Sequence, residues 1–255
     1  IKVKNENTVT ADNEWLKRCE DFEQSVLKYK SVRFSRFVSP HDLAVFKLRF
    51  KPSPFIHILA FGGASDCERV QIGFFPDFLE PDERAFPISP ILLTGVSGLS
   101  HRDILGSVLG LGIKREMTGD IFVDGDKAVI MSDSQVRDFL LYHLKTVGRK
   151  KVEVSLCPEE VSLSLEHAFQ IVRCVVASAR LDAVVGAAAN LSRSEAQDSI
   201  LGGNVSVNFV QTADTSKKLC VGDVISVRHH GRFVLENICG ETKKGRLAVE
   251  LKKYI

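Results

Sequence analysis

One segment near the C-terminal end restricts the fold most, because helix signals are followed there at once by strand signals. Two stretches with helical spacing come first, and a serine precedes each of them at the N-cap position, Ser178 and Ser192. Glu195 follows Ser192 at the spacing of a capping box. Gly202-Gly203 then favours a helix end, since that position often has a left-handed backbone. Apolar and polar residues alternate from Val205 onwards, so we expect two short helices followed by strands.

This segment resembles the S-four domain, an RNA-binding module named after a protein of the small ribosomal subunit. The resemblance depends on four motifs in a fixed order: Arg180-Leu181-Asp182, Leu191-Ser192-Arg193-Ser194-Glu195-Ala196, Gly203-Asn204-Val205-Ser206-Val207-Asn208 and Gly222-Asp223-Val224-Ile225. The first motif alone is weak, whereas the ordered set within one small domain is specific. The resemblance implies two helices, a small twisted sheet and a concave surface that follows an RNA backbone.

The basic and hydroxyl side chains of this segment are the candidate RNA contacts. Arg193 and Ser194 fall in the first turn of the second helix, where free N–H groups and the helix dipole favour phosphate. A lone Arg or Lys is about as often a solvated surface charge, so the prediction depends on the cluster. The complete candidate set is Arg180, Ser192, Arg193, Ser194, Lys217, Lys218, Arg228 and Arg232.

Composition is that of a globular protein, with 44% hydrophobic and 26% charged residues in a chain of 255. No run approaches the roughly 18 apolar residues of a membrane span, and the polar start carries no secretory signal. The six cysteines lack a Cys-x-x-Cys spacing, so we expect free thiols, no metal site and no cofactor.

Charge is distributed unevenly although the net charge is only +2. From Ser178 onwards there are eleven Lys and Arg against eight Asp and Glu, and the preceding residues hold 23 against 24. Basic residues gather at three places: Arg149–Lys151, Arg228–Arg232 and Lys243–Arg246. Such clusters fit a nucleic-acid partner, but the overall excess is too small to establish one.

The upstream part predicts an α+β fold with two subdomains, at 1–98 and 99–168, before the S-four-type domain at 169–255. Pro87 and Pro90 interrupt one apolar run, so we expect its strand to be an edge strand or irregular. Residues 158–166 are expected to form a polar linker. The expected helices are 12–30, 40–50, 100–111 and 132–145, and the expected strands are 55–61, 70–75, 86–93, 120–123, 128–131, 151–156 and 169–177.

Upstream motifs resemble the YlmH family over roughly residues 15–255. They are Phe61-Gly62-Gly63, Glu68-Arg69, Leu99–Gly106, Leu111–Glu116 and Gly119-Asp120-Ile121. The ending Glu241–Glu250 looks most like the photosystem II S-four-domain branch of cyanobacteria and plastids. This resemblance implies binding to ribosomal RNA and tRNA on the large ribosomal subunit, in ribosome assembly or in rescue of stalled complexes. It implies a monomer off the ribosome, in a bacterial cytoplasm or a plastid stroma.

Two motifs invite a catalytic interpretation that their spacing does not favour. On a helix, His101 and Asp103 point about 200° apart, so they cannot form a local acid–base pair. We instead predict a possible second RNA surface from Arg102, Lys114 and Arg115. Asp182 lies in a motif similar to that of the catalytic aspartate of pseudouridine synthases, but we expect a surface or helix-start role for it.

We therefore predict a non-enzymatic RNA-binding protein that recognises structured RNA by its shape and phosphates. One alternative is an RNA-modifying enzyme that uses the same module to deliver its substrate. The other is a protein-interaction scaffold linked to photosystem or division machinery.

Overall fold

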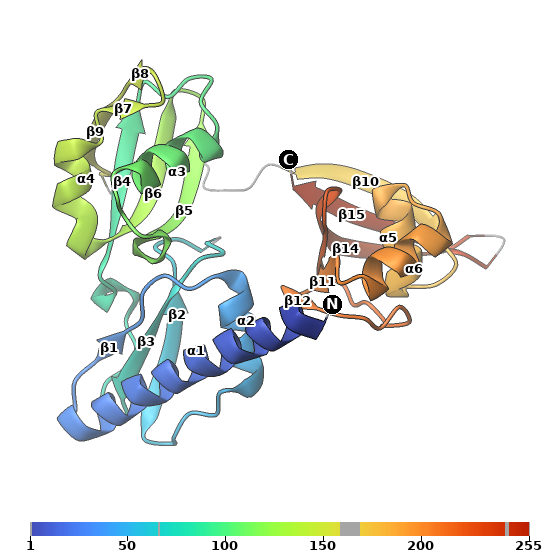
Figure 1. The fold of residues 1–255 in the computed structure, drawn as a ribbon, viewed down its shortest axis with the longest axis horizontal. Helices are drawn as coiled ribbons and strands as arrows, with labels where there is room; N and C mark the ends of the chain where they lie inside the picture. The colour runs from blue at the N-terminus through green and yellow to red at the C-terminus, as the bar shows by residue number, and fades with distance from the viewer. Residues whose placement is uncertain (1, 66, 159–168, 243–244, 255) are drawn as a thin grey trace. The chain divides into compact units, whose positions relative to one another are not determined.

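The computed structural model describes residues 2–65, 67–158, 169–242 and 245–254 (Figure 1). The fold is α+β, as predicted, and the chain divides into two compact units, the first made up of 7–166 and the second mainly of 167–255. Most of the predicted linker at 158–166, and Lys243-Lys244 of one basic cluster, lie outside the described residues.

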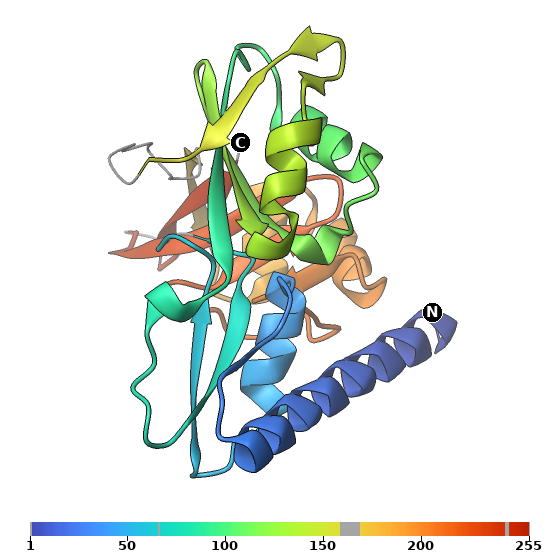
Figure 2. The same ribbon diagram turned by 90° about the vertical axis from the view of Figure 1, so that its left-hand side faces the viewer.

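The first unit begins with two helices on a small antiparallel sheet (Figure 2). Ser39 and Asp42 form a capping box at the start of α2, where Pro40 occupies the first turn. Phe22 of α1 stacks on Phe74 of β3 at 5.5 Å between ring centroids, within a core that also buries Cys19. The elements are α1 (Lys2–Tyr29), β1 (Arg33–Phe34), α2 (Pro40–Arg49), β2 (Ile56–Phe61) and β3 (Gln71–Pro76), with strand order β1-β3-β2.

A second sheet of the same unit is buried on both faces. On one face Ile91 and Leu93 pack in a core with Ile104 of α3 and Leu140 of α4, and on the other Leu92 packs with Phe37. The sheet has the order β5-β6-β4-β9. Its elements are η1 (Glu83–Ala85), β4 (Ile88–Thr94), α3 (His101–Gly110), η2 (Arg115–Met117), β5 (Thr118–Asp124), β6 (Lys127–Asp133), η3 (Ser134–Val136), α4 (Arg137–His143), β7 (Thr146–Val147), β8 (Lys150–Lys151) and β9 (Glu153–Leu156).

Two expectations about this sheet are wrong. The strand with the prolines, β4, is neither an edge strand nor irregular, because it pairs with β6 from Ile88 to Thr94 without a register shift and with β9 on its other side. Pro90 is tolerated because the β9 ladder begins one residue later, at Ile91, so no ladder bond there needs its missing N–H. The helix expected at 132–145 does not begin at Ser132 either, since Ser132 lies in β6 and Asp133 caps η3 instead.

The predicted division at residues 98 and 99 stays a prediction. The hydrogen-bonded sheet joins β4, which precedes residue 98, to strands that follow it. Residues on both sides of that position also share one core, for example Leu93 and Ile104.

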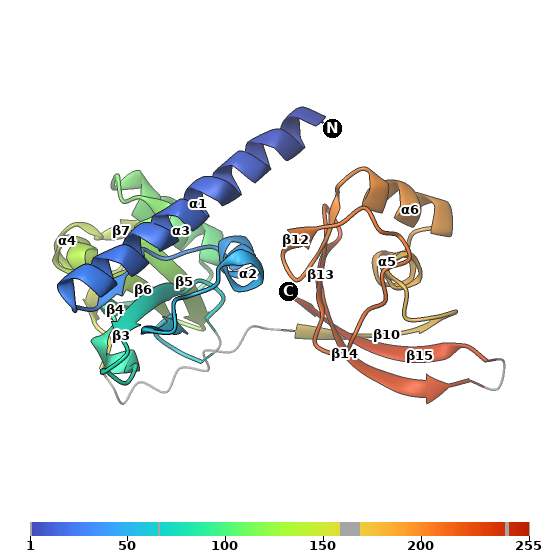
Figure 3. The same cartoon turned by 90° about the horizontal axis from the view of Figure 1, so that it is seen from below.

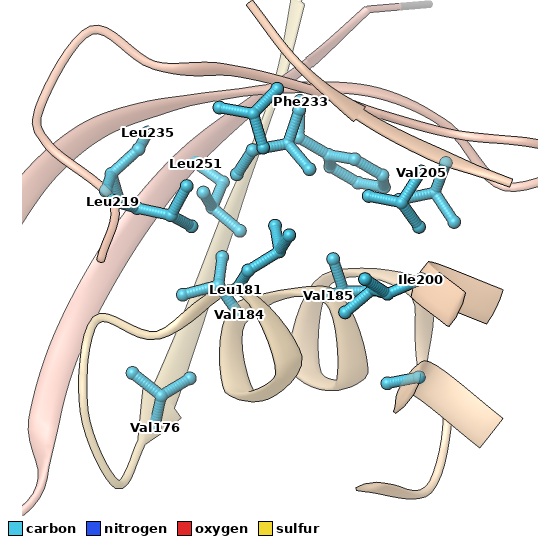
Figure 4. Packing of buried hydrophobic residues seen from close by; sticks show 14 of the residues in the cluster. Val176, Leu181, Val184, Val185, Ile200, Val205, Leu219, Phe233, Leu235 and Leu251 are labelled. Carbon is cyan, nitrogen blue, oxygen red and sulfur yellow. The ribbon is translucent and has the colours of Figure 1, made fainter. Parts of the chain in front are cut away.

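The second unit places two helices on one face of a six-stranded antiparallel sheet (Figure 3). Leu181 and Val185 of α5 and Ile200 of α6 pack against Phe233 and Leu251 of the sheet (Figure 4). The strand order is β10-β15-β14-β13-β11-β12. The elements are β10 (Phe169–Val176), α5 (Leu181–Ala189), α6 (Arg193–Leu201), β11 (Val205–Val207), β12 (Val210–Gln211), β13 (Val224–Val227), β14 (Gly231–Glu241) and β15 (Leu247–Tyr254).

The helix signals of this unit are partly confirmed. Ser192 and Glu195 form the predicted capping box of α6, and Gly203 after it has a φ of 72°. The prediction for Ser178 is wrong, because the N-cap of α5 is Arg180, which makes no side-chain capping bond. The first turn of α5 is fixed differently, since the amide of Leu181 donates to the carbonyl of Lys217.

Candidate nucleic-acid interface

A buried carboxylate joins the two helices of the second unit. Asp182, in the first turn of α5, has a side chain only 1% exposed. Its oxygens accept hydrogen bonds from Arg180 Nε at 3.1 Å, Arg193 Nε at 3.4 Å and Gln197 Nε2 at 3.1 Å. Asp182 thus lies at the helix start, as expected, but it is not a surface residue. We call Arg180, Asp182, Arg193 and Gln197 the Asp182 cluster.

The cluster keeps Asp182 ionised. Burial by itself raises the pKa of this carboxyl, but hydrogen bonds from Gln197 and Arg180, with the charge of Arg180, lower the pKa below its ordinary value. The two guanidinium groups remain accessible, since the side chain of Arg180 is 38% exposed and that of Arg193 is 72% exposed. A buried negative charge therefore orients two surface cations.

Backbone groups and lysines extend this positive surface. Arg193 and Ser194 occupy the first turn of α6, where backbone N–H groups have no partner within the helix. The Ser192 hydroxyl accepts from the amide of Glu195, so it serves the helix cap. Lys217 and Lys218 are exposed. They adjoin the start of α5 because the backbone of Lys218 forms an isolated antiparallel β-bridge with that of Arg180. Arg180, Arg193, Ser194, Lys217 and Lys218 thus lie around one site.

Arg228 and Arg232 belong to a different surface. In β14, Arg232 precedes the buried Phe233, so alternation directs its side chain to the sheet face opposite the helices. Both arginines line a hollow of about 810 Å³ together with Ser206, Ser226 and His229. The eight predicted contacts are therefore divided between two faces of the unit.

The three residues of the predicted second surface do not all lie together in the structure. Lys114 and Arg115 line a hollow of about 470 Å³ with Arg18, Arg36 and Arg69, whereas Arg102 lies in the first turn of α3 and is not part of it. Sequence spacing missed the three other arginines because they come from separate elements.

Burial affects the arginines of this hollow. Arg115 donates to the carbonyl of Gly119 at 3.1 Å, and Arg69 donates to that of Phe37 at 3.2 Å. Desolvation, followed by the charge of Arg69, lowers the pKa of Arg115 to about 10. The guanidinium groups of Arg69 and Arg115 thus hold loops together. Of the two predicted contacts in this hollow, Lys114 is exposed and is more accessible than Arg115.

A basic hairpin beside α4 is a further candidate that the sequence prediction noted only as a cluster. The hairpin β7–β8 exposes Arg149, Lys150 and Lys151. At the end of α4, Tyr142 is 73% exposed and lies under Lys145, with the ammonium 5.9 Å from the ring centroid. Exposed rings next to cations are typical of RNA-binding surfaces.

Within the described ranges, no group of three His, Cys, Asp or Glu side chains is arranged to hold a metal ion. All six cysteines, each of which is described, are free. No helix in the described part of the chain is long and apolar enough to cross a membrane.

Comparison with known proteins defines the family. Residues 94–160 match the family described as "Putative RNA-binding domain in YlmH". The "Ribosome-associated protein quality control protein P2" of Bacillus subtilis (strain 168) is 32% identical over 203 residues, which are 76% of this chain and 77% of the relative. The chain belongs to the YlmH family. The match at 94–160 covers α3, α4 and the basic hairpin, and it ends before the second unit.

A solved structure of the YlmH family agrees with this assignment. The "Cell division protein ylmH from Streptococcus pneumoniae" has a TM-score of 0.53 and 25% sequence identity to this chain. The similarity covers 58% of this chain and 92% of that one. The predicted family is thereby confirmed.

Proposed function

We propose that this protein binds structured ribosomal RNA or tRNA at the large ribosomal subunit and performs no chemistry on it. Its role would be in ribosome assembly or in the rescue of stalled complexes. The observation that supports this most is the Asp182 cluster, in which a buried carboxylate orients two accessible guanidinium groups beside a helix N-terminus.

The cluster suits a phosphate backbone. Guanidinium groups recognise phosphate through paired N–H donors, and fixing them beforehand lowers the ordering cost of binding. Arg193 adds its charge at the N-terminus of α6, and Lys217 and Lys218 add theirs from the adjoining turn. Such contacts follow the shape of RNA rather than its base sequence, since side chains cannot read the narrow A-form major groove.

The alternative of an RNA-modifying enzyme has a specific argument against it. A catalytic aspartate must reach the substrate, whereas the Asp182 side chain is 1% exposed and is hydrogen-bonded to two arginines and Gln197. The names of the relatives also support binding: one is ribosome-associated, and the matched family is described as RNA-binding.

The first unit supplies the proposed second contact. Its predicted residues are Arg102, Lys114 and Arg115, and the basic hairpin Arg149–Lys151 lies within the residues that match the family. Such a protein would work wherever its ribosomes are, in a bacterial cytoplasm or a plastid stroma, and would be monomeric off the ribosome.

Co-sedimentation tests the proposal directly. The full chain, mixed with separated ribosomal subunits, should pellet with the large subunit at low salt and be released as salt rises, because phosphate contacts release counterions. Crosslinking of the bound fraction should then map to ribosomal RNA or tRNA. If the chain pellets only with protein partners, and salt does not release it, the scaffold alternative would be favoured instead.

A further inference from the structure

The outer face of the second unit's sheet, opposite the helices, has its own pattern of side chains. Phe233 and Leu251 point to the helix side and are fully buried. Their neighbours Arg232 and Lys252 therefore point outwards, on the same side as Tyr254. Phe169 of β10 pairs directly with Tyr254 and joins this outer face.

Rings and cations form a continuous row on this face. Phe169 and Tyr254 contact edge to face, with ring centroids 4.8 Å apart. The guanidinium carbon of Arg232 lies 5.1 Å from the centroid of the Tyr254 ring and 5.1 Å from that of Phe209. The ammonium of Lys252 lies 5.7 Å from the Phe169 ring centroid. We call Phe169, Tyr254, Arg232 and Phe209 the aromatic row.

Phe209 occupies a position that a phenylalanine does not favour. It forms, with Asn208, the two-residue turn between β11 and β12. Both residues have positive φ values, 50° for Asn208 and 66° for Phe209. Turns of this kind favour Asn followed by Gly, because a side chain with a Cβ is strained at positive φ. The turn itself would therefore be better served by glycine, and the ring calls for another explanation.

A polar hollow adjoins the row. The hollow of about 810 Å³ is lined by Arg228 and Arg232, by the hydroxyls of Ser206 and Ser226, and by Gln211. These groups offer hydrogen-bond donors and acceptors together with positive charge. The two arginines give the hollow a charge that suits an anionic polymer.

We propose that this outer face binds unpaired nucleotides of an RNA, with bases stacked on the aromatic row and their phosphates near Arg228 and Arg232. The inference rests on the proposed RNA-binding function and adds a second, single-stranded site to it. Rings can stack on a base only when the base is splayed out of a helix, so the substrate is a loop or a single-stranded extension. The Asp182 cluster, by contrast, suits the backbone of a duplex.

Phe209→Gly separates a binding role from a structural one. Glycine relieves the strain at φ 66°, so the melting temperature should stay the same or rise. Loss of the ring should weaken the binding of single-stranded RNA by about fivefold or more, because stacking contributes roughly 1–3 kcal/mol per base. Tyr254→Ala should weaken it similarly, and Tyr254→Phe should bind normally because stacking needs only the ring. Phe78→Ala, which removes an exposed ring of the first unit, is the matched control.

Each full-length variant is titrated with two RNAs: a blunt-ended ribosomal RNA duplex of two strands, which has no loop, and the same duplex carrying about six unpaired nucleotides at one end. The proposal expects Phe209→Gly to weaken the extended RNA only, and Arg193→Ala to weaken both. Equal loss on both RNAs, or no loss on the extended one, would overturn the inference. Failure of the unsubstituted protein to bind either RNA would instead contradict the proposed function itself.

Discussion

Asp182 is the residue on which the candidate interface depends, because its carboxylate contacts side chains of both helices. The sequence placed Arg180 and Arg193 in one candidate set through the family motifs. It did not indicate that a buried Asp182 joins them, since the contacts with Arg193 and Gln197 form only when α6 folds back on α5. Contacts between side chains of two different helices leave no local pattern in the sequence.

Asp182→Asn should lower the free energy of unfolding at pH 7 by roughly 1.5–3 kcal/mol, the usual contribution of a hydrogen bond to a charged group. The folded pKa of Asp182 is lowered, so its contribution is present above the ordinary pKa and is lost as pH falls through the folded pKa. Denaturant unfolding of both proteins at pH 7 and near pH 2 should show the gap closing in acid. A gap that persists unchanged in acid would contradict the assigned charge.

The cysteines give a second prediction for single residues. Burial, followed by the charges of Glu20 and Asp42, raises the pKa of the Cys19 thiol to about 12. The reactive species is the thiolate, so Cys19 should resist iodoacetamide near pH 8 until the protein is unfolded. Cys220 and Cys239 are exposed and should be alkylated first, as peptide mass spectrometry can show. Early alkylation of Cys19 would mean that its core opens readily.

Among the elements, local signals were the most predictable. The capping boxes at Ser39, Ser100 and Ser192 involve residues three apart, and the three helices after them begin at, or within one residue of, the starts expected from the sequence. The interior position of β4 was not predictable, because its neighbours β6 and β9 come from later in the chain. Pro90 suggested an edge because the rule considers the lost N–H and not where the partner strand begins.

Ser192→Ala should cost about 1 kcal/mol of unfolding free energy, since its hydroxyl accepts from the amide of Glu195. Ser178→Ala is the matched control, because Ser178 precedes α5 without capping it, and its effect should be within about 0.5 kcal/mol. Chemical denaturation of the two variants makes the comparison. Equal costs would mean that Ser178 has a role in α5 that its geometry does not show.

At the scale of the whole molecule, the sequence predicted the family and the class of fold, but it placed the basic residues of the second unit in one candidate set. The structure separates Arg228 and Arg232 from Arg180 and Arg193, because strand alternation directs Arg232 away from the helices. That division was within reach of the sequence, since Arg232 immediately precedes an apolar residue in a strand. The gathering of Arg18, Arg36 and Arg69 was not, because it depends on tertiary folding.

If the first unit makes a second RNA contact, a fragment of residues 167–255 should bind ribosomal RNA more weakly than the full chain. Two linked sites gain from effective concentration, so the loss should exceed about tenfold. A fragment beginning at Ser178 would be unsuitable, because it lacks β10, whose Val176 is buried in the core. Side-by-side titrations measure the difference, and circular dichroism checks that the fragment folds. Equal affinity would leave the first unit as a protein-contact element.

The central claim is that the Asp182 cluster and its adjoining lysines hold an RNA backbone, and the salt dependence of binding tests it most directly. The double variant Arg193→Ala with Lys217→Ala removes two exposed charges and one partner of Asp182, and it should remain folded because Arg180 and Gln197 still donate to that carboxylate. Its log–log salt slope should flatten by roughly 0.7–0.9 for each lost phosphate contact, whereas the matched variant Arg84→Ala with Lys51→Ala should keep the original slope. An unchanged slope and affinity in the first variant would show that the RNA binds elsewhere.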